Sequence, residues 1–286
     1  MAMRHKGFVA FILTHGRPDR VLTYDKLLKH GYTGKIYIVC DDEDKTLPAY
    51  RERFENVLVF SKAKIAATFD EGDNFGDRRA IVYARNACFD LARQVGATHF
   101  IELDDDYTYF KFRFDDQLRW HGADVKDLDA VFDMLLDYFD SAPMLTLAIG
   151  QGGDYMGGES ASRFKDGIQP MRKAMNSFIC SVNRPFQFVG RINEDVNTYV
   201  FAGSRGGVFL SILQIGFDQL ETQSNSGGMT ELYLDSGTYV KSFYTVIYCP
   251  SSVVVSAMGT AHRRLHHQVR WRYAVPKILR ESIKKR

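Results

Sequence analysis

Short apolar runs alternate with amphipathic segments over the first third of the chain. Apolar runs of strand length lie at residues 7–15, 35–42, 56–61 and 98–106. Between them, residues 80–95 carry apolar side chains at helical spacing, and shorter helical patterns begin at Pro18 and Leu47. Strands that are apolar on both faces and alternate with helices are typical of a mostly parallel sheet covered by helices on both sides. The pattern therefore predicts an α/β protein.

Composition narrows the class of protein. The chain has 286 residues, of which 45% are hydrophobic, enough for one large domain or two fused lobes. No apolar run approaches the roughly 20 residues that span a bilayer, and residues 1–6 lack the apolar part of a signal peptide, so we expect a cytoplasmic protein without a membrane segment. Four cysteines stand far apart, without a Cys-x-x-Cys pair, and are interpreted as buried thiols: Cys40, Cys88, Cys180 and Cys249.

Charge is concentrated at the C-terminal end. Residues 262–286 hold nine Lys or Arg residues against the single Glu281, a net charge of +8, which leaves −6 for residues 1–261 of a total of +2. A cationic end on an acidic body suits a polyanion such as DNA. The alternative is a solvated C-terminal helix. The candidate DNA-binding residues are Arg263, Arg264, Arg270 and Arg272.

Polar residues follow three of the predicted strands at the point where each strand ends. They are Thr14 and Arg17, Asp41 and Asp42, and Asp104, Asp105 and Asp106. Ligands of open α/β sheets bind at the carboxyl ends of the strands. Three consecutive carboxylates repel one another unless a cation or hydrogen-bond donors offset them, and oxygen ligands of this kind suit Mg²⁺ or Mn²⁺. An acidic turn facing water is the alternative.

Other nucleotide-binding classes are disfavoured. No Gly-x-Gly-x-x-Gly opens a clear helix behind the first strand, and no P-loop lysine motif occurs, which argues against a dehydrogenase or a P-loop ATPase.

A doubly wound half whose acidic strand ends in Asp-x-Asp resembles the GT-A fold of nucleotide-sugar-dependent glycosyltransferases. The resemblance implies that Asp104 lies near the ribose and Asp106 binds a divalent metal ion, with Asp105 in either role and Asp104 also available to the metal. It further implies that Asp41 or Asp42 contacts the nucleoside. Arg85 and Asn86, in the sequence YARN, are expected near the diphosphate.

The second half contains a candidate base. The Glu194-Asp195 pair resembles the family's Glu-Asp motif, which implies that Asp195 deprotonates the acceptor hydroxyl; an acidic first turn that stabilises a helix dipole is the alternative. Many GT-A enzymes bring a late histidine to the metal. His266 or His267 fits this role better than His262, and a nitrogen ligand favours Mn²⁺ over Mg²⁺.

A narrower resemblance covers nearly the whole chain. The chain is similar to the TET-associated glycosyltransferases of tailed phages in the stretches LTHGRPDR, YIVCDDED, VYARNACFDLA, LDDDYT, MNSFICSVNRPFQFVGRINEDVNTYV, TQSNSGGMTELY, GTYVKSFYTVIYCPS, RRLHH and WRYAVPKI. This resemblance implies sugar transfer from a nucleotide sugar, with a UDP-sugar expected, onto a hydroxymethylated pyrimidine in DNA, typically 5-hydroxymethylcytosine. It also implies a TET-like oxygenase as a functional partner and the cytoplasm of an infected bacterium as the location.

These expectations give a division of the chain. Residues 1–286 are expected to form one GT-A-like domain with a donor half (1–110), a mixed acceptor and catalytic half (111–261) and a basic segment (262–286). The aromatic and basic stretch YTYFKFRF (107–114) either grips an extruded nucleotide or forms an ordinary strand with a buried aromatic face. Two other functions stay open: transfer to a protein or glycan hydroxyl, and non-catalytic binding of modified DNA.

Overall fold

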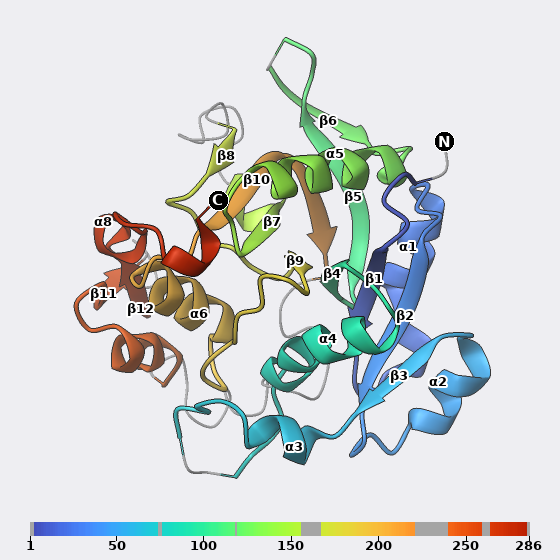
Figure 1. Ribbon diagram of the computed structural model, residues 1–286, viewed down its shortest axis with the longest axis horizontal. Coiled ribbons are helices and arrows are strands. Elements are labelled where there is room, and N and C mark those ends of the chain that lie inside the picture. The colour runs from blue at the N-terminus through green and yellow to red at the C-terminus, as the bar shows by residue number, and fades with distance from the viewer. Residues whose placement is uncertain are drawn as a thin grey trace.

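The computed structural model describes residues 3–73, 76–117, 119–155, 167–220, 240–258 and 264–284 (Figure 1). Candidate residue Arg263, with His262 and the stretch TQSNSGGMTELY, lies outside the described residues.

The N-terminal half contains the predicted alternation of strands and helices. The strands β1 (Phe8–Leu13), β2 (Lys35–Asp41), β3 (Val57–Phe60) and β4 (His99–Asp104) are parallel, in the order β3-β2-β1-β4. All six residues of β1 are buried, as expected for a strand covered on both faces. The connections contain η1 (Pro18–Arg20), α1 (Leu22–Lys29), α2 (Leu47–Arg53), α3 (Lys62–Ala66) and α4 (Val82–Gln94).

The second half continues the same sheet with strands of both directions. Beyond β4 follow β9 (Phe178–Ser181), β7 (Thr146–Gln151), β10 (Phe209–Gln219), β5 (Tyr107–Phe114) and β6 (Trp120–Asp124), and the short β8 (Ile168–Gln169) pairs with β10. Strands β5, β8 and β9 run against the common direction of the others. The sheet is therefore mostly parallel, and the predicted α/β, GT-A-like fold is confirmed.

Helices cover both faces of the sheet. Leu27 of α1 and Phe132 of α5 (Leu128–Ser141) share one core cluster with Ile12. Cys88 of α4 and Val200 of α6 (Glu194–Gly203) share the other with residues of β1 and β4. Because successive side chains of a strand point to opposite faces, β1 contributes side chains to both clusters. All four cysteines are buried and unpaired by disulfides, as predicted.

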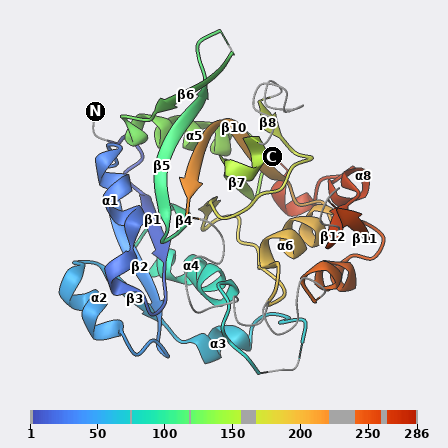
Figure 2. The same cartoon turned by 180° about the vertical axis from the view of Figure 1, so that it is seen from behind.

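The stretch 107–114 forms strand β5, but its aromatic residues do not share one buried face. Tyr107 and Phe110 are buried, whereas Tyr109 and Phe112 are 37% and 38% exposed. Strand β5 starts at the carboxyl edge of the sheet and runs away from it, and the β5–β6 hairpin projects from the body at the side opposite to α3 (Figures 1 and 2).

The C-terminal segment forms a separate layer beside α6. A helix at residues 240–248 is followed by the antiparallel pair β11 (Val253–Met258) and β12 (Arg264–Val269), and then by α8 (Trp271–Ala274) and the short turn η5 (Glu281–Ile283). Another short turn, η2 (Gly152–Tyr155), follows β7. The described part of the basic segment is thus a strand and short helical turns. Two of its residues, Trp271 and Ala274, pack on α6. A Cβ atom on Gly203 would lie 2.2 Å from the carbonyl oxygen of Ala274, so only glycine allows this approach.

None of the helices in the described ranges is both long enough and apolar enough to cross a lipid bilayer.

Candidate active site

A buried arginine connects the acidic strand with the helix that carries the candidate base. Arg85 of α4 is 1% exposed and contacts three carboxylates: its Nη1 lies 3.5 Å from Glu102, its Nη2 3.2 Å from Asp104, and its Nε 3.2 Å from Glu194. The aromatic ring of Phe178 lies on its guanidinium, 4.8 Å from centroid to Cζ. Arg85 thus links Asp104 at the end of β4 with Glu194 at the start of α6.

Burial and mutual repulsion raise the pKa values of these carboxyl groups. Burial raises the pKa of Glu102 to about 8, although the Arg85 charge opposes the shift. Burial also raises the pKa of Asp104 to about 7, against Arg85 and with help from the neighbouring Asp106 charge. For Glu194, burial and the adjacent Asp195 raise the pKa to about 7. Arg85 alone cannot neutralise three ionised carboxylates, so the cluster is partly protonated at pH 7.

The other two carboxylates of the Asp-Asp-Asp run differ in their contacts. Asp105 is 2% exposed, accepts a hydrogen bond from the Thr14 hydroxyl at 2.6 Å and pairs with Arg17 at 3.1 Å. Asp106 is half-buried, and its carboxylate has no hydrogen bond or ion pair to the side chain of another described residue; its own backbone N–H and the Arg17 charge act on it. Burial and the Asp105 charge raise the pKa of Asp106 to about 6. Asp106 is therefore the member of the run that is available to a ligand.

The carboxyl ends of β1, β2 and β3 meet at a second acidic group. Asp41 is 4% exposed, accepts from the Glu43 backbone N–H at 3.0 Å, and pairs with His15 Nδ1 at 2.7 Å and Lys62 Nζ at 3.1 Å. Asp42 is exposed, and its carboxylate accepts from the Lys62 backbone N–H at 2.9 Å. Asp41 is thus enclosed by its own partners, while the His15 side chain, 54% exposed, faces outward beside it.

Helix α6 begins at a residue with left-handed backbone geometry. Asn193, with φ of 54°, precedes Glu194, and its side-chain amide donates to the Lys241 carbonyl at 2.7 Å. Asparagine tolerates this conformation better than most residues. The turn places Glu194 toward Arg85 and leaves Asp195 7% exposed.

Two lysines act electrostatically on the candidate base. Burial raises the pKa of Asp195, whereas the charges of Arg85, Lys241 and Lys173 lower it. Lys173 also lies 3.7 Å from Asp154. Both lysines are also among the charges that lower the pKa of His266, so they act on the candidate base and on this histidine alike.

The two late histidines are adjacent on β12. The rings of His266 and His267 lie 4.3 Å apart between centroids. Burial, Arg264 and the lysine charges lower the pKa of His266, and burial with His266 lowers the pKa of His267 to about 4. Both rings are therefore mainly neutral at pH 7, the form that binds metal ions. The buried Nδ1 of His267 has no hydrogen-bond partner among the described residues.

The structure does not gather a complete metal site from side chains alone. In the described ranges, no three His, Cys, Asp or Glu side chains converge on a common point that could hold an ion. The contributions of Asp104, Asp106, His266 and His267 to metal binding stay predictions.

Asn86 is held by hydrogen bonds inside the protein, whereas the candidate DNA-binding arginines lie on its surface. The Asn86 amide group donates to the Phe188 carbonyl at 3.0 Å and accepts from its N–H at 2.8 Å, which fixes the chain leading to α6. Arg264, Arg270 and Arg272 are exposed. Their side chains are thus accessible to a partner, unlike the buried Arg85.

Sequence reasoning missed three lysines and one histidine that lie near these carboxylates or act on them. Lys62 and His15 directly follow strands β3 and β1, so the same rule that selected Thr14 applies to them as well. Lys173 and Lys241 lie in segments without a local motif. Arg17 had been expected at the site, yet its pairing with Asp105 had no sequence signal.

The fold and this acidic edge define a glycosyltransferase of the GT-A-like class. A family model described as TET-Associated Glycosyltransferase matches residues 8–228, more than half of the chain. The chain belongs to this family and is a glycosyltransferase. A comparison with curated proteins finds no significant match.

Proposed function

We propose that the protein transfers a sugar from a nucleotide sugar, with a UDP-sugar as the first donor to test, to the hydroxymethyl group of a modified pyrimidine in DNA, 5-hydroxymethylcytosine in the first instance. The observation that carries the proposal is the convergence of Asp104, Glu194 and Glu102 on Arg85 at the carboxyl edge of the sheet, beside Asp106 and Asp195. The family supports sugar transfer and suggests modified DNA as the acceptor.

The carboxylates after β4 are ligands of the kind that a divalent cation prefers, and the described residues show no preformed group of three ligands around them. Asp106 has no side-chain partner in the described part of the chain, and its raised pKa of about 6 reflects burial beside another carboxylate, a situation that a cation relieves. We propose that Asp106 and Asp104, together with His266 or His267, hold Mn²⁺ or Mg²⁺, and that substrate phosphate oxygens complete the coordination. The bound ion supplies positive charge that stabilises the leaving diphosphate.

The same proposal assigns a second group of residues to the binding of the nucleotide-sugar donor. They are Thr14, Arg17, Asp41, Asp42 and Asp105. Asp105 is held by Thr14 and Arg17, so it positions the loop after β4. The enclosed Asp41 orients His15, and the exposed Asp42, held by the Lys62 backbone N–H, contacts the nucleoside.

The chemical step assigned to this chain is a proton transfer. The acceptor oxygen forms a bond to the anomeric carbon as the bond from that carbon to the diphosphate breaks, and the electron pair leaves with the nucleoside diphosphate. Asp195 accepts the hydroxyl proton. Lys173 and Lys241 support its ionised form, and Arg85 holds the neighbouring Glu194 and with it the first turn of α6.

Mass spectrometry tests the proposal directly. The protein is incubated with Mn²⁺, a panel of nucleotide sugars and an oligonucleotide that contains 5-hydroxymethylcytosine, with an unmodified-cytosine oligonucleotide as control. We expect the mass of one hexose or N-acetylhexosamine to be added to the modified strand alone. Asp195→Asn is expected to abolish most of the gain, and Asp116→Asn, an exposed carboxylate of the β5–β6 turn, serves as its matched control.

The other outcomes separate the alternatives. Equal gain on both strands would exclude the hydroxymethyl group as acceptor. Tight binding to the modified strand without gain would identify a binding module, and absence of both would indicate a protein or glycan acceptor. A TET-like oxygenase is proposed as the source of the hydroxymethyl group, and added oxygenase should make an oligonucleotide with 5-methylcytosine a substrate.

A further inference from the structure

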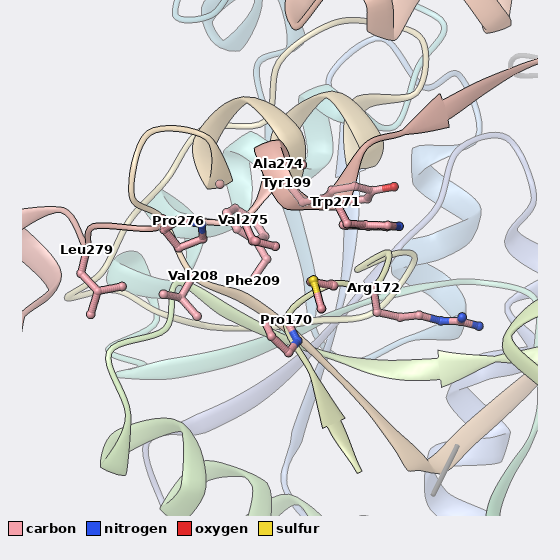
Figure 3. A pocket seen from close by; sticks show the side chains of 13 residues that line it. Pro170, Arg172, Tyr199, Val208, Phe209, Trp271, Ala274, Val275, Pro276 and Leu279 are labelled. Carbon is pink, nitrogen blue, oxygen red and sulfur yellow. The ribbon is translucent and has the colours of Figure 1, made fainter. Parts of the chain in front are cut away.

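An apolar pocket lies one helical turn beyond the candidate base. Its cavity of about 300 Å³ is enclosed by α6, α8, the start of β10 and residues 170–172 (Figure 3). The walls include Met171, Val208, Phe209, Trp271 and Leu279. This volume is at the lower end of the range for small-molecule pockets, about 300–1,000 Å³, and suits a single ring with its substituents.

One wall of the pocket is a pair of stacked aromatic rings. Tyr199 of α6 and Trp271 of α8 lie 5.5 Å apart between centroids at an angle of 19°. Figure 3 shows the Tyr199 oxygen and the Trp271 nitrogen directed to the same side as the guanidinium group of Arg172. The pocket thus combines an apolar interior, an aromatic platform and one polar side, which are the features of a site for a planar heteroaromatic ring.

The polar side of the pocket is close to Asp195. Residues 195 and 199 are four apart on α6, so their side chains lie on the same face of the helix, one turn from each other. The charges of Asp195 and Asp154 add to the burial that raises the pKa of Tyr199, and Asp154 pairs with Arg172 at 2.8 Å. A ring bound in the pocket therefore has a substituent within reach of the candidate base.

Exposed positive charge lies next to Trp271 in the chain and suits a nucleic-acid strand. Arg270 and Arg272 flank Trp271 in the sequence, and both are exposed. Phosphate contacts from arginine, combined with stacking of a base on an aromatic ring, are how proteins hold single-stranded or extruded nucleotides.

We propose that the extruded pyrimidine of the acceptor strand binds in this pocket on the Trp271 wall, with its hydroxymethyl group toward Asp195 and its flanking phosphates at Arg270 and Arg272. The inference rests on the proposed DNA acceptor and assigns that acceptor to a place on the chain. The site lies partly beyond residue 228, where the family match ends.

Tryptophan fluorescence tests the occupant. The chain has two tryptophans, Trp120 and Trp271, so Trp120→Phe leaves the pocket residue as the single indole. This variant is titrated with a labelled single-stranded oligonucleotide containing 5-hydroxymethylcytosine, and with the same oligonucleotide carrying an abasic site at that position. Label anisotropy reports binding of each strand independently. We expect the first strand to quench Trp271 and the abasic strand to bind without quenching it.

Four results would overturn the assignment. Binding of the modified strand without a change in Trp271 fluorescence would place the base elsewhere. Quenching by UDP alone would assign the pocket to the donor. If neither strand binds, both the DNA acceptor and the pocket assignment are wrong. If sugar is transferred to the oligonucleotide without quenching of Trp271, the proposed function stands and only the pocket assignment is wrong.

Kinetics provide a second, independent measurement. Trp271→Ala is expected to raise KM for the modified oligonucleotide about 5- to 150-fold, the range for loss of one stacked base, with KM for the nucleotide sugar unchanged. Trp271→Phe keeps an aromatic face and should recover most of the loss. Trp120→Ala is the matched control on the projecting β5–β6 hairpin. An unchanged acceptor KM in a folded Trp271→Ala protein, or an equal rise in both KM values, would contradict the assignment.

Discussion

Glu102→Gln should make the protein more stable at neutral and alkaline pH. Glu102 is 0% exposed, its two carboxylate oxygens have no hydrogen-bond partner among the described residues, and its closest cation is 3.5 Å away on Arg85. Burial raises its pKa from 4.5 to about 8, so the folded protein keeps this proton at pH 7 while the unfolded chain loses it.

The direction and size of the effect follow from linkage between protonation and folding. Because the folded-state pKa is the higher one, the free energy of unfolding falls as the pH rises from 4.5 to about 8. At about 1.4 kcal/mol per pKa unit, the full shift corresponds to roughly 5 kcal/mol, of which about 3 kcal/mol is lost between pH 5 and pH 8. Glutamine does not ionise, so the free energy of unfolding of the variant lacks this part of the decline with pH.

Urea denaturation at several pH values between 5 and 8 measures the difference. We expect the wild-type protein and Glu102→Gln to be similar at pH 5, and the variant to be more stable by about 3 kcal/mol at pH 8. Glu55→Gln, at an exposed glutamate after α2, controls for the chemical change itself. Parallel pH dependences for wild type and Glu102→Gln, or a less stable variant at pH 8, would refute the assignment of a neutral Glu102.

The remaining predictions concern the proposed roles of site residues. Asp106→Asn should make binding of UDP independent of Mn²⁺ in calorimetry, and retention of a Mn²⁺-dependent affinity would remove Asp106 from the metal site. Asp195→Asn should lower kcat about 10²- to 10⁴-fold with an unchanged KM for the donor; single-turnover transfer at near the wild-type rate would exclude it as base. Neutralising Arg264, Arg270 or Arg272 should each make the salt dependence of DNA affinity shallower by about one unit of slope, and a constant slope would locate the DNA on another surface.

The N-terminal half could be predicted because its signals are local. The run 7–15 is apolar on both faces and becomes β1, buried throughout, and the helical pattern at 80–95 becomes α4. Strand β9 has only four residues and sits between β4 and β7, which are distant in sequence. Its position depends on long-range pairing that no local pattern encodes.

The candidate site was predictable to a similar extent. The three aspartates after β4 are adjacent in the sequence, so their proximity needed no fold. The contact between Asp104 and Glu194 through Arg85 depends on how α4 and α6 pack on one sheet face, and helical periodicity gives a buried position but not its partners. Lys173 and Lys241 approach Asp195 from loops and helices whose placement is set entirely by tertiary packing.

The crowding of carboxyl groups around Arg85 makes the thermal stability of this protein a sensor of its ligands. Repulsion among Asp104, Asp106 and Glu194 weakens the native state at neutral pH, so neutralisation of that charge raises the melting temperature. A ligand that binds only the folded chain adds RT ln(1 + [L]/Kd) to its stability. Screening of metal ions and nucleotide sugars by melting temperature can thus rank candidate donors before any acceptor is known.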